Sequence, residues 1–423
     1  MPRKLRLVCT GCGTEYDPPR LHCDRCDGLL RSRYAVRSFE PADRSDLFAF
    51  QDWLPAAAST DISIGTVVYP SEGLAERLGL TNLAIAFSGY APEIGAENPT
   101  GSFKDFEAAP TMLYYREHGI ESLVLASAGN TARAFAYAGV RLDFSVLLVV
   151  PERALERLWI PCEPTGAVRL VALDGCDDYT AAIRAAGLIG RTLGIANEGG
   201  ARNVARRDGM STAMLEYAKQ MDSLPTHYFQ AIGSGTGAIA TWESSQRLLT
   251  AGIGNALPQL HLSQNAPFTP VHDAWAHGTP IEPDRDVEGQ LRRIDRIDAL
   301  VLANRMPPYA VAGGVRDALT STGGHTYTVT NEEARVVVVL FEQTEGHAIG
   351  PASAVATGSL IQALETEQIA RDDAIMLHVT GNNETLLRRD FTLHRIEPAW
   401  RVDPDAITPE SIEAARARLG VSP

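Results

Sequence analysis

The chain has 423 residues, 45% of them hydrophobic, which is enough for a globular protein of two or three domains. Its formal net charge of −14 argues against a nucleic-acid-binding or anionic-membrane-binding protein, because both need a basic face. No apolar run is long enough to cross a membrane, and the basic start at residues 1–4 does not continue into a signal peptide. We therefore expect a cytoplasmic protein that binds neither nucleic acid nor membrane.

The first notable pattern is a pair of CxxC motifs within the first 26 residues, formed by Cys9, Cys12, Cys23 and Cys26. Each motif can form a tight knuckle whose two thiolates point the same way, so together they predict a structural zinc ribbon over residues 1–35. Four thiolates leave no open position for a catalytic water. Two disulfides, or a redox CxxC, are the competing interpretations, and reducing conditions disfavour the disulfides. The ten histidines lack metal-ligand spacing, so no catalytic metal is expected.

The next segment holds a predicted short helix and the most chemically informative lysine. Residues 72–79 read as a helix that begins after an N-cap at Ser71 and ends on Gly79. Lys104 follows in the motif ENPTGSFKD, at the end of a loop and the start of a helix through 106–109. Burial there would lower the pKa of the amine and make it a nucleophile toward an aldehyde, as a Schiff-base lysine requires. A plain loop lysine beside a helix start is the alternative.

After this lysine, strand-like apolar runs alternate with helical stretches, which is typical of parallel α/β sheets with crossover helices. The tail at residues 408–420 has an N-cap, a first-turn proline and a closing glycine, so it is a predicted terminal helix. The expected strands are 123–126, 145–150, 168–173, 228–232, 260–263, 336–341 and 375–379, and the expected helices include 178–192 and 209–220.

Two loops that follow expected strands have the composition of anion sites. SAGNT at 127–131 leads into a helix, and its free backbone N–H groups are a natural site for a carboxylate. GSGTG at 233–237 also leads into a helix, and its glycines would let the backbone approach a phosphate. Either loop alone is a weak signal, because glycine-rich turns after strands are common.

In this order, NPTGSFKD, SAGNT, GSGTG and the TGN at 380–382 resemble pyridoxal-phosphate (PLP) enzymes of fold type II, the tryptophan synthase β type, on the threonine synthase branch. The resemblance covers nearly the whole chain. It implies two open parallel-sheet subdomains in a catalytic domain at 36–423, the smaller one inserted at roughly 105–215. It also implies that Lys104 carries the cofactor, that Asn130 binds its 3′-oxygen and that Thr380 faces the pyridine nitrogen. The cofactor phosphate would be held by Gly233, Ser234, Gly235, Thr236 and Gly237.

The chain departs from threonine synthases on the substrate side. Their FKDRG is FKDFE here, with Phe106 and Glu107, and Ser211 stands where the RIEGQKT segment has its lysine. These variants, together with NRMPPY at 304–309, are similar to cysteate synthases. That resemblance implies a β-replacement that converts O-phosphoserine and sulfite into cysteate and phosphate through an aminoacrylate, in a homodimer or higher homo-oligomer. Three alternatives remain open: threonine synthase acting on O-phosphohomoserine and water, β-replacement with another nucleophile, and a PLP-binding regulatory subunit.

Since the chain is acidic, local cations must attract anionic substrates. Arg133 lies one turn into the helix after SAGNT and could reach a substrate anion, or it could be a solvated or salt-bridged helix arginine. Arg206 and Arg207 match a family segment tied to phosphate recognition. His347 reads as a packed or surface histidine. The candidate substrate-binding residues are Ser127, Thr131, Arg133, Arg206 and Arg207.

Overall fold

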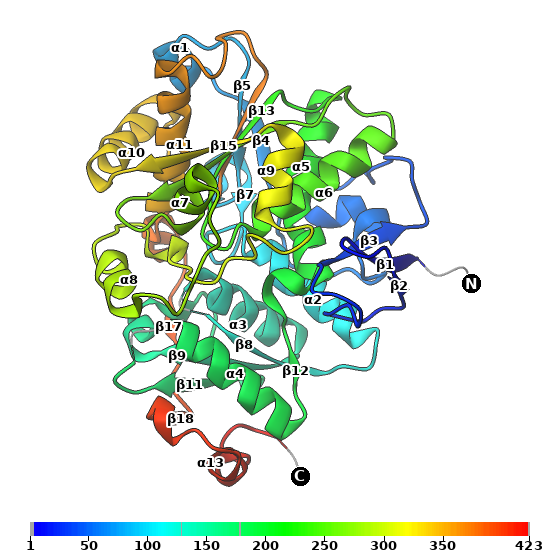
Figure 1. Cartoon of the computed structure of the whole chain (residues 1–423), viewed down its shortest axis with the longest axis vertical. Coiled ribbons are helices and arrows are strands. Elements are labelled where there is room, and N and C mark those ends of the chain that lie inside the picture. Colours follow the sequence, from blue (N-terminus) through cyan, green and yellow to red (C-terminus); the bar gives the residue numbers. More distant parts are fainter. Residues whose placement is uncertain (1–3, 128, 177–178, 422–423) are drawn as a thin grey trace.

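The structure is a computed structural model that describes residues 4–127, 129–176 and 179–421 (Figure 1). Residue 128 of the SAGNT loop and the expected helix start at 178 lie outside the described residues. In the part of the chain that is described, none of the helices combines the length and the apolar character needed to cross a lipid bilayer.

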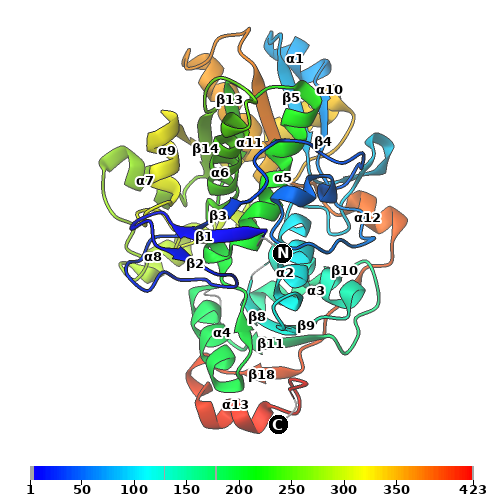
Figure 2. The same ribbon diagram turned by 90° about the vertical axis from the view of Figure 1, so that its right-hand side faces the viewer.

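The N-terminal segment folds as a small antiparallel sheet in the order β2-β1-β3, formed by β1 (Leu5–Cys9), β2 (Glu15–Tyr16) and β3 (Leu30–Tyr34). Buried residues alternate along β1 because successive side chains of a strand point to opposite faces. The sheet lies midway along the long axis of the molecule, against its side (Figure 2).

The larger of two mainly parallel sheets has six strands. In order they are β15 (His325–Val329), β14 (Gln259–Asn265), β13 (His227–Ala231), β16 (Ile375–Val379), β5 (Leu83–Phe87) and β4 (Val67–Pro70). Only the edge strand β4 runs antiparallel to its neighbour.

Helices cover both faces of this sheet, so its inner strands β13, β16 and β5 are buried along their whole length. Ala84 and Ala86 belong to the core shared with α2 (Asp105–Arg116), α5 (Val204–Met221), α6 (Thr236–Thr250) and α9 (Val315–Thr322). Ile85 and Phe87 belong to the core shared with α1 (Gly73–Leu78), α10 (Asn331–Glu345) and α11 (Pro351–Glu365).

The smaller sheet has five parallel strands in the order β12 (Ala196–Asn197), β8 (Ser122–Ala126), β9 (Ser145–Pro151), β11 (Val168–Leu173) and β18 (Trp400–Val402). Leu123 and Leu125 pack toward α3 (Asn130–Leu142). Val124 packs toward α4 (Tyr179–Leu193) and α13 (Pro409–Ala415). The strand β18 comes from outside the 105–215 range expected for this subdomain, so the tail of the chain completes the sheet (Figure 1).

Short elements connect these layers. The pairs β6–β7 and β10–β17 are antiparallel. The connecting elements are β6 (Tyr90–Ala91), β7 (Ala96–Glu97), β10 (Trp159–Ile160), β17 (His394–Arg395), α7 (Pro270–His277), α8 (Val287–Ile294), α12 (Thr385–Asp390) and the 3-10 turns η1 (Leu47–Trp53), η2 (Pro92–Ile94), η3 (Glu152–Arg157), η4 (Gly200–Arg202), η5 (Leu300–Leu302) and η6 (Pro404–Ala406).

The expected α/β architecture is confirmed, but the strand expected at 336–341 is wrong, because these residues lie inside α10. Ala334, Val337 and Phe341 are buried at helical spacing, whereas Val336 and Val339 are 68% and 53% exposed. The run of valines has the local composition of a strand, but in the structure only one face of the helix is buried, and the other valines are exposed. A Thr330 capping box starts the helix.

The other expected strands form at or close to their predicted bounds. The N-cap of α1 is Glu72 rather than Ser71. Ser71 still supports this helix, because its hydroxyl accepts a hydrogen bond from Ala75 N at 3.1 Å and donates one to Glu345 at 2.6 Å. The terminal helix α13 forms with a capping box at Thr408, but it ends at Ala415 rather than at the predicted Gly420.

Candidate active site

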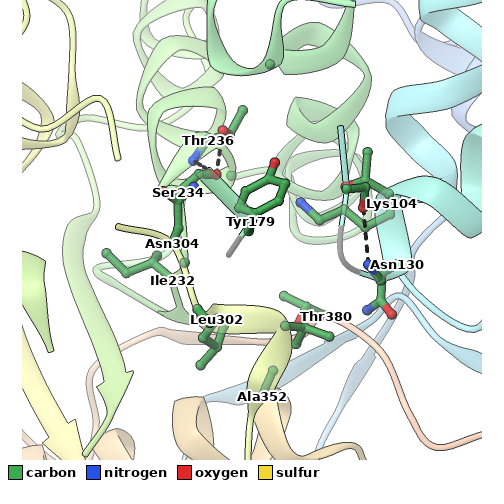
Figure 3. A pocket seen from close by; sticks show the side chains of 18 of the residues that line it. Lys104, Asn130, Tyr179, Ile232, Ser234, Thr236, Leu302, Asn304, Ala352 and Thr380 are labelled. Atoms are coloured by element: carbon green, nitrogen blue, oxygen red, sulfur yellow. Dashed lines mark hydrogen bonds between the residues drawn. The ribbon is translucent and has the colours of Figure 1, made fainter. Parts of the chain in front are cut away.

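A cavity of about 870 Å³ lies between the two parallel sheets, at the carboxyl ends of β8, β13 and β16 (Figure 3). This is where ligands bind in open α/β sheets, because the connecting loops meet there. Nearly all of the site residues expected from the sequence line it: Lys104, Ser127, Asn130, Thr131, Arg133, Arg206, Gly233, Ser234, Gly235, Thr236, Gly237 and Thr380.

Contacts made by the residues before and after Lys104 hold this lysine in place. It is the N-cap residue of α2, and the loop before it is fixed by Thr100, whose N and Oγ1 donate to the Asp105 carboxylate at 2.9 and 2.8 Å. Phe103 N donates to Thr380 O at 2.9 Å. The lysine loop and the β16 terminus are therefore joined directly, and Lys104 faces the cavity from a rigid base (Figure 3).

The electrostatic surroundings of Lys104 suit a reactive amine. Burial lowers the pKa of Lys104, and the nearby Glu107 carboxylate opposes this shift without cancelling it. Lys104 Nζ donates to Glu107 Oε1 at 2.7 Å, and Glu107 is fully buried. The Lys104 amine is thus paired with the Glu107 carboxylate, and its side chain is largely shielded from water.

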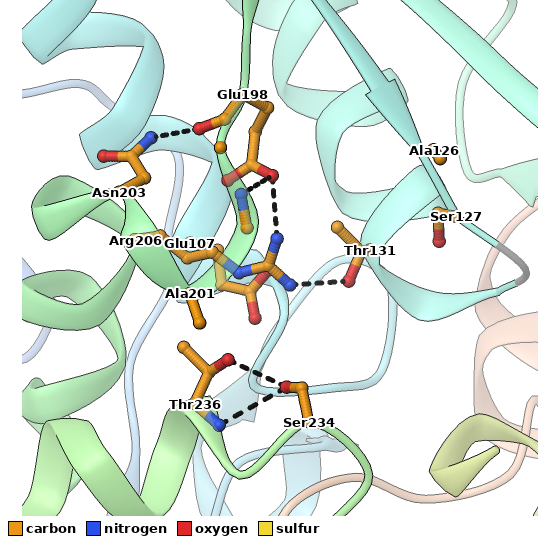
Figure 4. A network of polar contacts seen from close by, with 12 residues as sticks. Glu107, Ala126, Ser127, Thr131, Glu198, Ala201, Asn203, Arg206, Ser234 and Thr236 are labelled. Carbon is orange, nitrogen blue, oxygen red and sulfur yellow. Dashed lines mark hydrogen bonds and ion pairs between the residues drawn. The ribbon is translucent and has the colours of Figure 1, made fainter. Parts of the chain in front are cut away.

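Glu107 belongs to a chain of alternating charges that continues through Arg206 to Glu198 (Figure 4). Arg206 Nη2 lies 2.9 Å from Glu107 Oε2, and Arg206 Nη1 lies 2.8 Å from Glu198 Oε2. Burial by itself lowers the pKa of Arg206, but the two carboxylates together raise it above its ordinary value. Arg206 Nη2 also donates to Thr131 Oγ1 at 3.4 Å.

Sequence reasoning did not identify Glu107 and Glu198 as site residues. Glu107 lies three residues after Lys104, so in a helix the two side chains share a face, and this spacing was an available signal. Glu198 comes from the loop after β12 and had no local signal.

The glycine loop between β13 and α6 fits a phosphate. Gly235 is the N-cap of α6 with φ of 72°, a conformation that glycine adopts without strain. A Cβ on Gly233 would lie 3.0 Å from Leu302 O, and one on Gly237 would lie 2.5 Å from Gln230 Nε2. Larger residues would therefore collide with these neighbours and displace the loop, whose position at the N-terminus of α6 suits an anion.

The loop after β8 carries the second set of expected residues. Ser127 Oγ accepts hydrogen bonds from Gly129 N at 3.2 Å and Ala132 N at 3.1 Å, which fixes the turn into α3. Arg133 donates to Asn130 Oδ1 and stacks on Trp159, with its guanidinium carbon 4.2 Å from the ring centroid.

Arg207 is not brought to the cavity. Its Nε lies 3.0 Å from Glu243 Oε2, and its other nitrogens donate to Ala201 O and Leu30 O. These bonds join α5 to α6 and to β3 of the N-terminal sheet, so its position is that of a structural arginine. Ser211 is likewise buried within α5, where its hydroxyl donates to Asp208 O at 2.6 Å.

His347 lies edge-on to Tyr69 and Phe87, with ring centroids 6.2 and 5.8 Å away, as expected for a packed histidine.

The four N-terminal cysteines come together as one cluster. Their sulfur atoms all lie within 4.8 Å of one another, with Cys9–Cys26 at 3.4 Å, Cys12–Cys23 at 3.5 Å and Cys23–Cys26 at 3.9 Å. Thiolates about 2.3 Å from a tetrahedral zinc ion are separated by roughly 3.8 Å. The cluster is therefore compatible with a structural zinc.

Comparisons with known proteins agree with this geometry. The model of a family described as "Pyridoxal-phosphate dependent enzyme" matches residues 96–381. The chain is 46% identical over 403 residues to the cysteate synthase of Methanosarcina acetivorans, which covers 94% of this chain and 97% of that protein. It is 45% identical over 410 residues to the cysteate synthase of Methanocella arvoryzae, which covers 96% of this chain and 98% of that protein.

Solved structures support the fold alone. The processed form of threonine deaminase isoform 2 from Solanum lycopersicum superposes with a TM-score of 0.59 at 18% identity, over 83% of this chain and 93% of that chain. Diaminopropionate ammonia lyase from Escherichia coli gives 0.58 at 14% identity, over 84% and 94%.

The lysine, the glycine cradle and the cysteine cluster thus occur in a chain whose relatives match it almost from end to end. PLP is its cofactor, and the chain belongs to the PLP-dependent enzymes of fold type II and, within them, to the cysteate synthase family.

Proposed function

We propose that the protein converts O-phosphoserine and sulfite into cysteate and phosphate. The observation that carries the proposal is the near full-length similarity to cysteate synthases, in a chain whose reactive lysine faces the cavity. In the reaction, the Cβ–O bond breaks with its electron pair going to phosphate, and the sulfur lone pair of sulfite forms the new Cβ–S bond. No external oxidant or reductant is required.

The expected cofactor-binding residues each have a task in this reaction. Bound PLP supplies an electron sink for the negative charge that develops at the substrate α-carbon. Lys104 would hold the cofactor, and its free amine would take the α-proton on Nζ. Glu107, at 2.7 Å, stabilises the resulting ammonium. Asn130 binds the 3′-oxygen, and a Thr380 hydroxyl cannot hold the ring nitrogen protonated as a carboxylate would.

The two loops that precede α6 and α3 bind anions. Gly233, Ser234, Gly235, Thr236 and Gly237 hold the cofactor phosphate at the N-terminus of α6. Ser127 and Thr131 orient the substrate carboxylate at the N-terminus of α3.

The position of Arg206 argues against the threonine synthase alternative. This arginine matches a family segment tied to phosphate recognition, but here Glu107 and Glu198 both engage it. A γ-phosphate would have to compete with two buried carboxylates for its guanidinium.

A side-by-side assay tests the proposal. Holoenzyme is given O-phosphoserine or O-phosphohomoserine, each with and without sulfite, and phosphate release and amino-acid products are measured by mass spectrometry. We expect sulfite-dependent cysteate from phosphoserine. Threonine formed without sulfite dependence would favour threonine synthase, and phosphate release with neither product would indicate another nucleophile.

Two lysine variants distinguish an enzyme from a non-catalytic PLP-binding regulatory subunit. Lys104→Ala should remain folded but lose both turnover and the visible absorption band of the bound cofactor. Lys219→Ala, which changes a surface lysine late in α5, should keep both. An active, coloured Lys104→Ala protein would contradict the assignment.

We also propose a cytoplasmic homo-oligomer. The cysteine cluster supports a reducing compartment, because thiols keep their metal-binding form there. Light scattering of the purified protein will measure its oligomeric state.

A further inference from the structure

Two arginines that line the active-site cavity, Arg133 and Arg157, have no carboxylate partner within ion-pair distance among the residues that the structure describes. Buried or half-buried guanidinium groups are normally paired, since an isolated charge is costly to desolvate. Two arginines that face a cavity without a carboxylate partner are therefore a candidate site for an anionic ligand.

The other two arginines that line this cavity are already engaged. Arg206 is shared by Glu107 and Glu198, and Arg202 Nη2 lies 2.6 Å from Asp27 Oδ1. The positive charge left for a ligand thus comes from the side of the cavity formed by α3 and η3.

Arg133 is oriented but not neutralised. It stacks on Trp159 and donates one hydrogen bond to the neutral Asn130 side chain, while its Nε is buried without a hydrogen-bond partner in the described part of the chain. Burial lowers the pKa of Arg133 to about 10. The carboxyl groups of Glu384 and Asp105 oppose this shift without forming an ion pair with Arg133, whereas the charge of Arg157 adds to it. At neutral pH Arg133 remains charged.

Arg157 ends the 3-10 turn η3, directly after the smaller sheet's strand β9. Its neighbour Arg153 points elsewhere and pairs with Asp295 at 2.6 Å. Three acidic residues in the described part of the chain line the cavity: Glu198, which pairs with Arg206, Glu384, which pairs with Arg388 at 2.9 Å, and the exposed Glu156.

We propose that Arg133 and Arg157 form an oxyanion site that holds the phosphate as it leaves the substrate β-carbon and then the sulfite that replaces it. The inference rests on the proposed function. Phosphate and sulfite are both small oxyanions, so the same guanidinium donors can bind them in turn. Using one site for both groups places the sulfur lone pair next to the carbon that phosphate has just left.

Binding of inorganic sulfate to the holoenzyme tests the site without turnover. Sulfate is an inert tetrahedral dianion, and in the holoenzyme the glycine loop is already filled by the cofactor phosphate. Arg157→Gln should weaken sulfate binding about tenfold or more, as expected for the loss of a charge-assisted contact. In steady-state assays it should raise the KM for sulfite more than it lowers kcat.

Arg153→Gln is the matched control, because it removes an arginine from the same turn that pairs outside the cavity. It should bind sulfate like the wild type. Arg133→Gln should reproduce the Arg157→Gln loss, with retained cofactor absorption showing that the protein is folded.

Wild-type-like sulfate binding in Arg157→Gln, or no sulfate binding by the wild type, would overturn the proposal. If sulfate binding depends on Arg157 but no cysteate is formed from phosphoserine and sulfite, the proposed function fails while the oxyanion site stands.

Discussion

Lys104, Glu107, Arg206 and Glu198 alternate in charge, so the cluster is neutral when all four groups are ionised. Burial alone raises the pKa of Glu198, and Arg206 counteracts this shift. Each charge in the cluster depends on its neighbour, because water cannot replace a lost partner at this depth. Glu107 lies between Lys104 and Arg206 in this row of charges and contacts both of them.

Replacing Glu107 with glutamine should therefore destabilise the protein and slow turnover. We expect a loss of about 3 kcal/mol in the free energy of unfolding, because two buried cations lose a shared counter-ion. Urea unfolding of the apoprotein measures the change, and single-turnover kinetics measure the slower proton transfer at Lys104.

Glu413→Gln is a suitable control, since Glu413 and Arg416 have the same i, i+3 spacing as Lys104 and Glu107 but lie on the surface. It should leave the urea midpoint unchanged. Equal effects of the two substitutions would show that the buried network contributes no more than an exposed pair.

At the scale of elements, the proposed phosphate-binding loop depends on how a strand turns into a helix. The turn from β13 into α6 places Gly235 in a left-handed conformation, and an added Cβ there would collide with the Val315 side chain of α9. Backbone geometry and tight packing both exclude a larger residue at this position.

Gly235→Ala should therefore weaken PLP binding more than tenfold, because the backbone must shift away from the phosphate-binding geometry. Titration of apoprotein with PLP, followed by its absorbance, gives the affinity. Gly252→Ala provides the control: Gly252 also has a left-handed φ, of 87°, but no atom lies within 4 Å of its added Cβ and it follows the far end of α6. It should lose some stability and retain PLP affinity, and equal losses of affinity would mean that backbone strain alone accounts for the effect.

The elements also show what the sequence could and could not predict. Short apolar runs bounded by turns became strands, and contiguous motifs such as GSGTG lie in loops that line the cavity. The run at 336–341 failed because valines favour strands locally, whereas the one-sided burial that made it helical depends on α11. Glu198 and Arg157 could not be identified because their significance arises only when a loop or a short turn meets the cavity.

The whole molecule adds a link between the cysteine cluster and the active site. Thr10 Oγ1 and Leu29 N, which flank the cluster, donate to Ala312 O at 2.7 and 3.0 Å. Residues just before Ala312 in the same segment, including Met306 and Val311, line the cavity. The ribbon also holds Arg202, another cavity residue, through Asp27. The loops of the N-terminal segment therefore contact two segments that line the cavity.

Removal of the metal should loosen these segments without removing the cofactor. Cys12→Ser should lower the zinc content from about one ion per chain to near zero, because a tetrahedral structural site loses one of its four ligands. We expect faster hydrogen exchange at residues 303–312, a several-fold higher KM for phosphoserine and an unchanged PLP content, because Lys104 and the glycine loop do not contact the ribbon segment that is released.

The half-buried Cys162 lies outside the cluster, so Cys162→Ser should change none of these quantities. Since exchange at 303–312 reports on backbone protection directly, it separates a brace from a general loss of stability. If Cys12→Ser loses its zinc while exchange in this segment stays at the wild-type rate, the ribbon does not brace the cavity. If exchange instead rises uniformly across α5, α6 and both sheets, the ribbon stabilises the whole fold rather than the two segments it contacts.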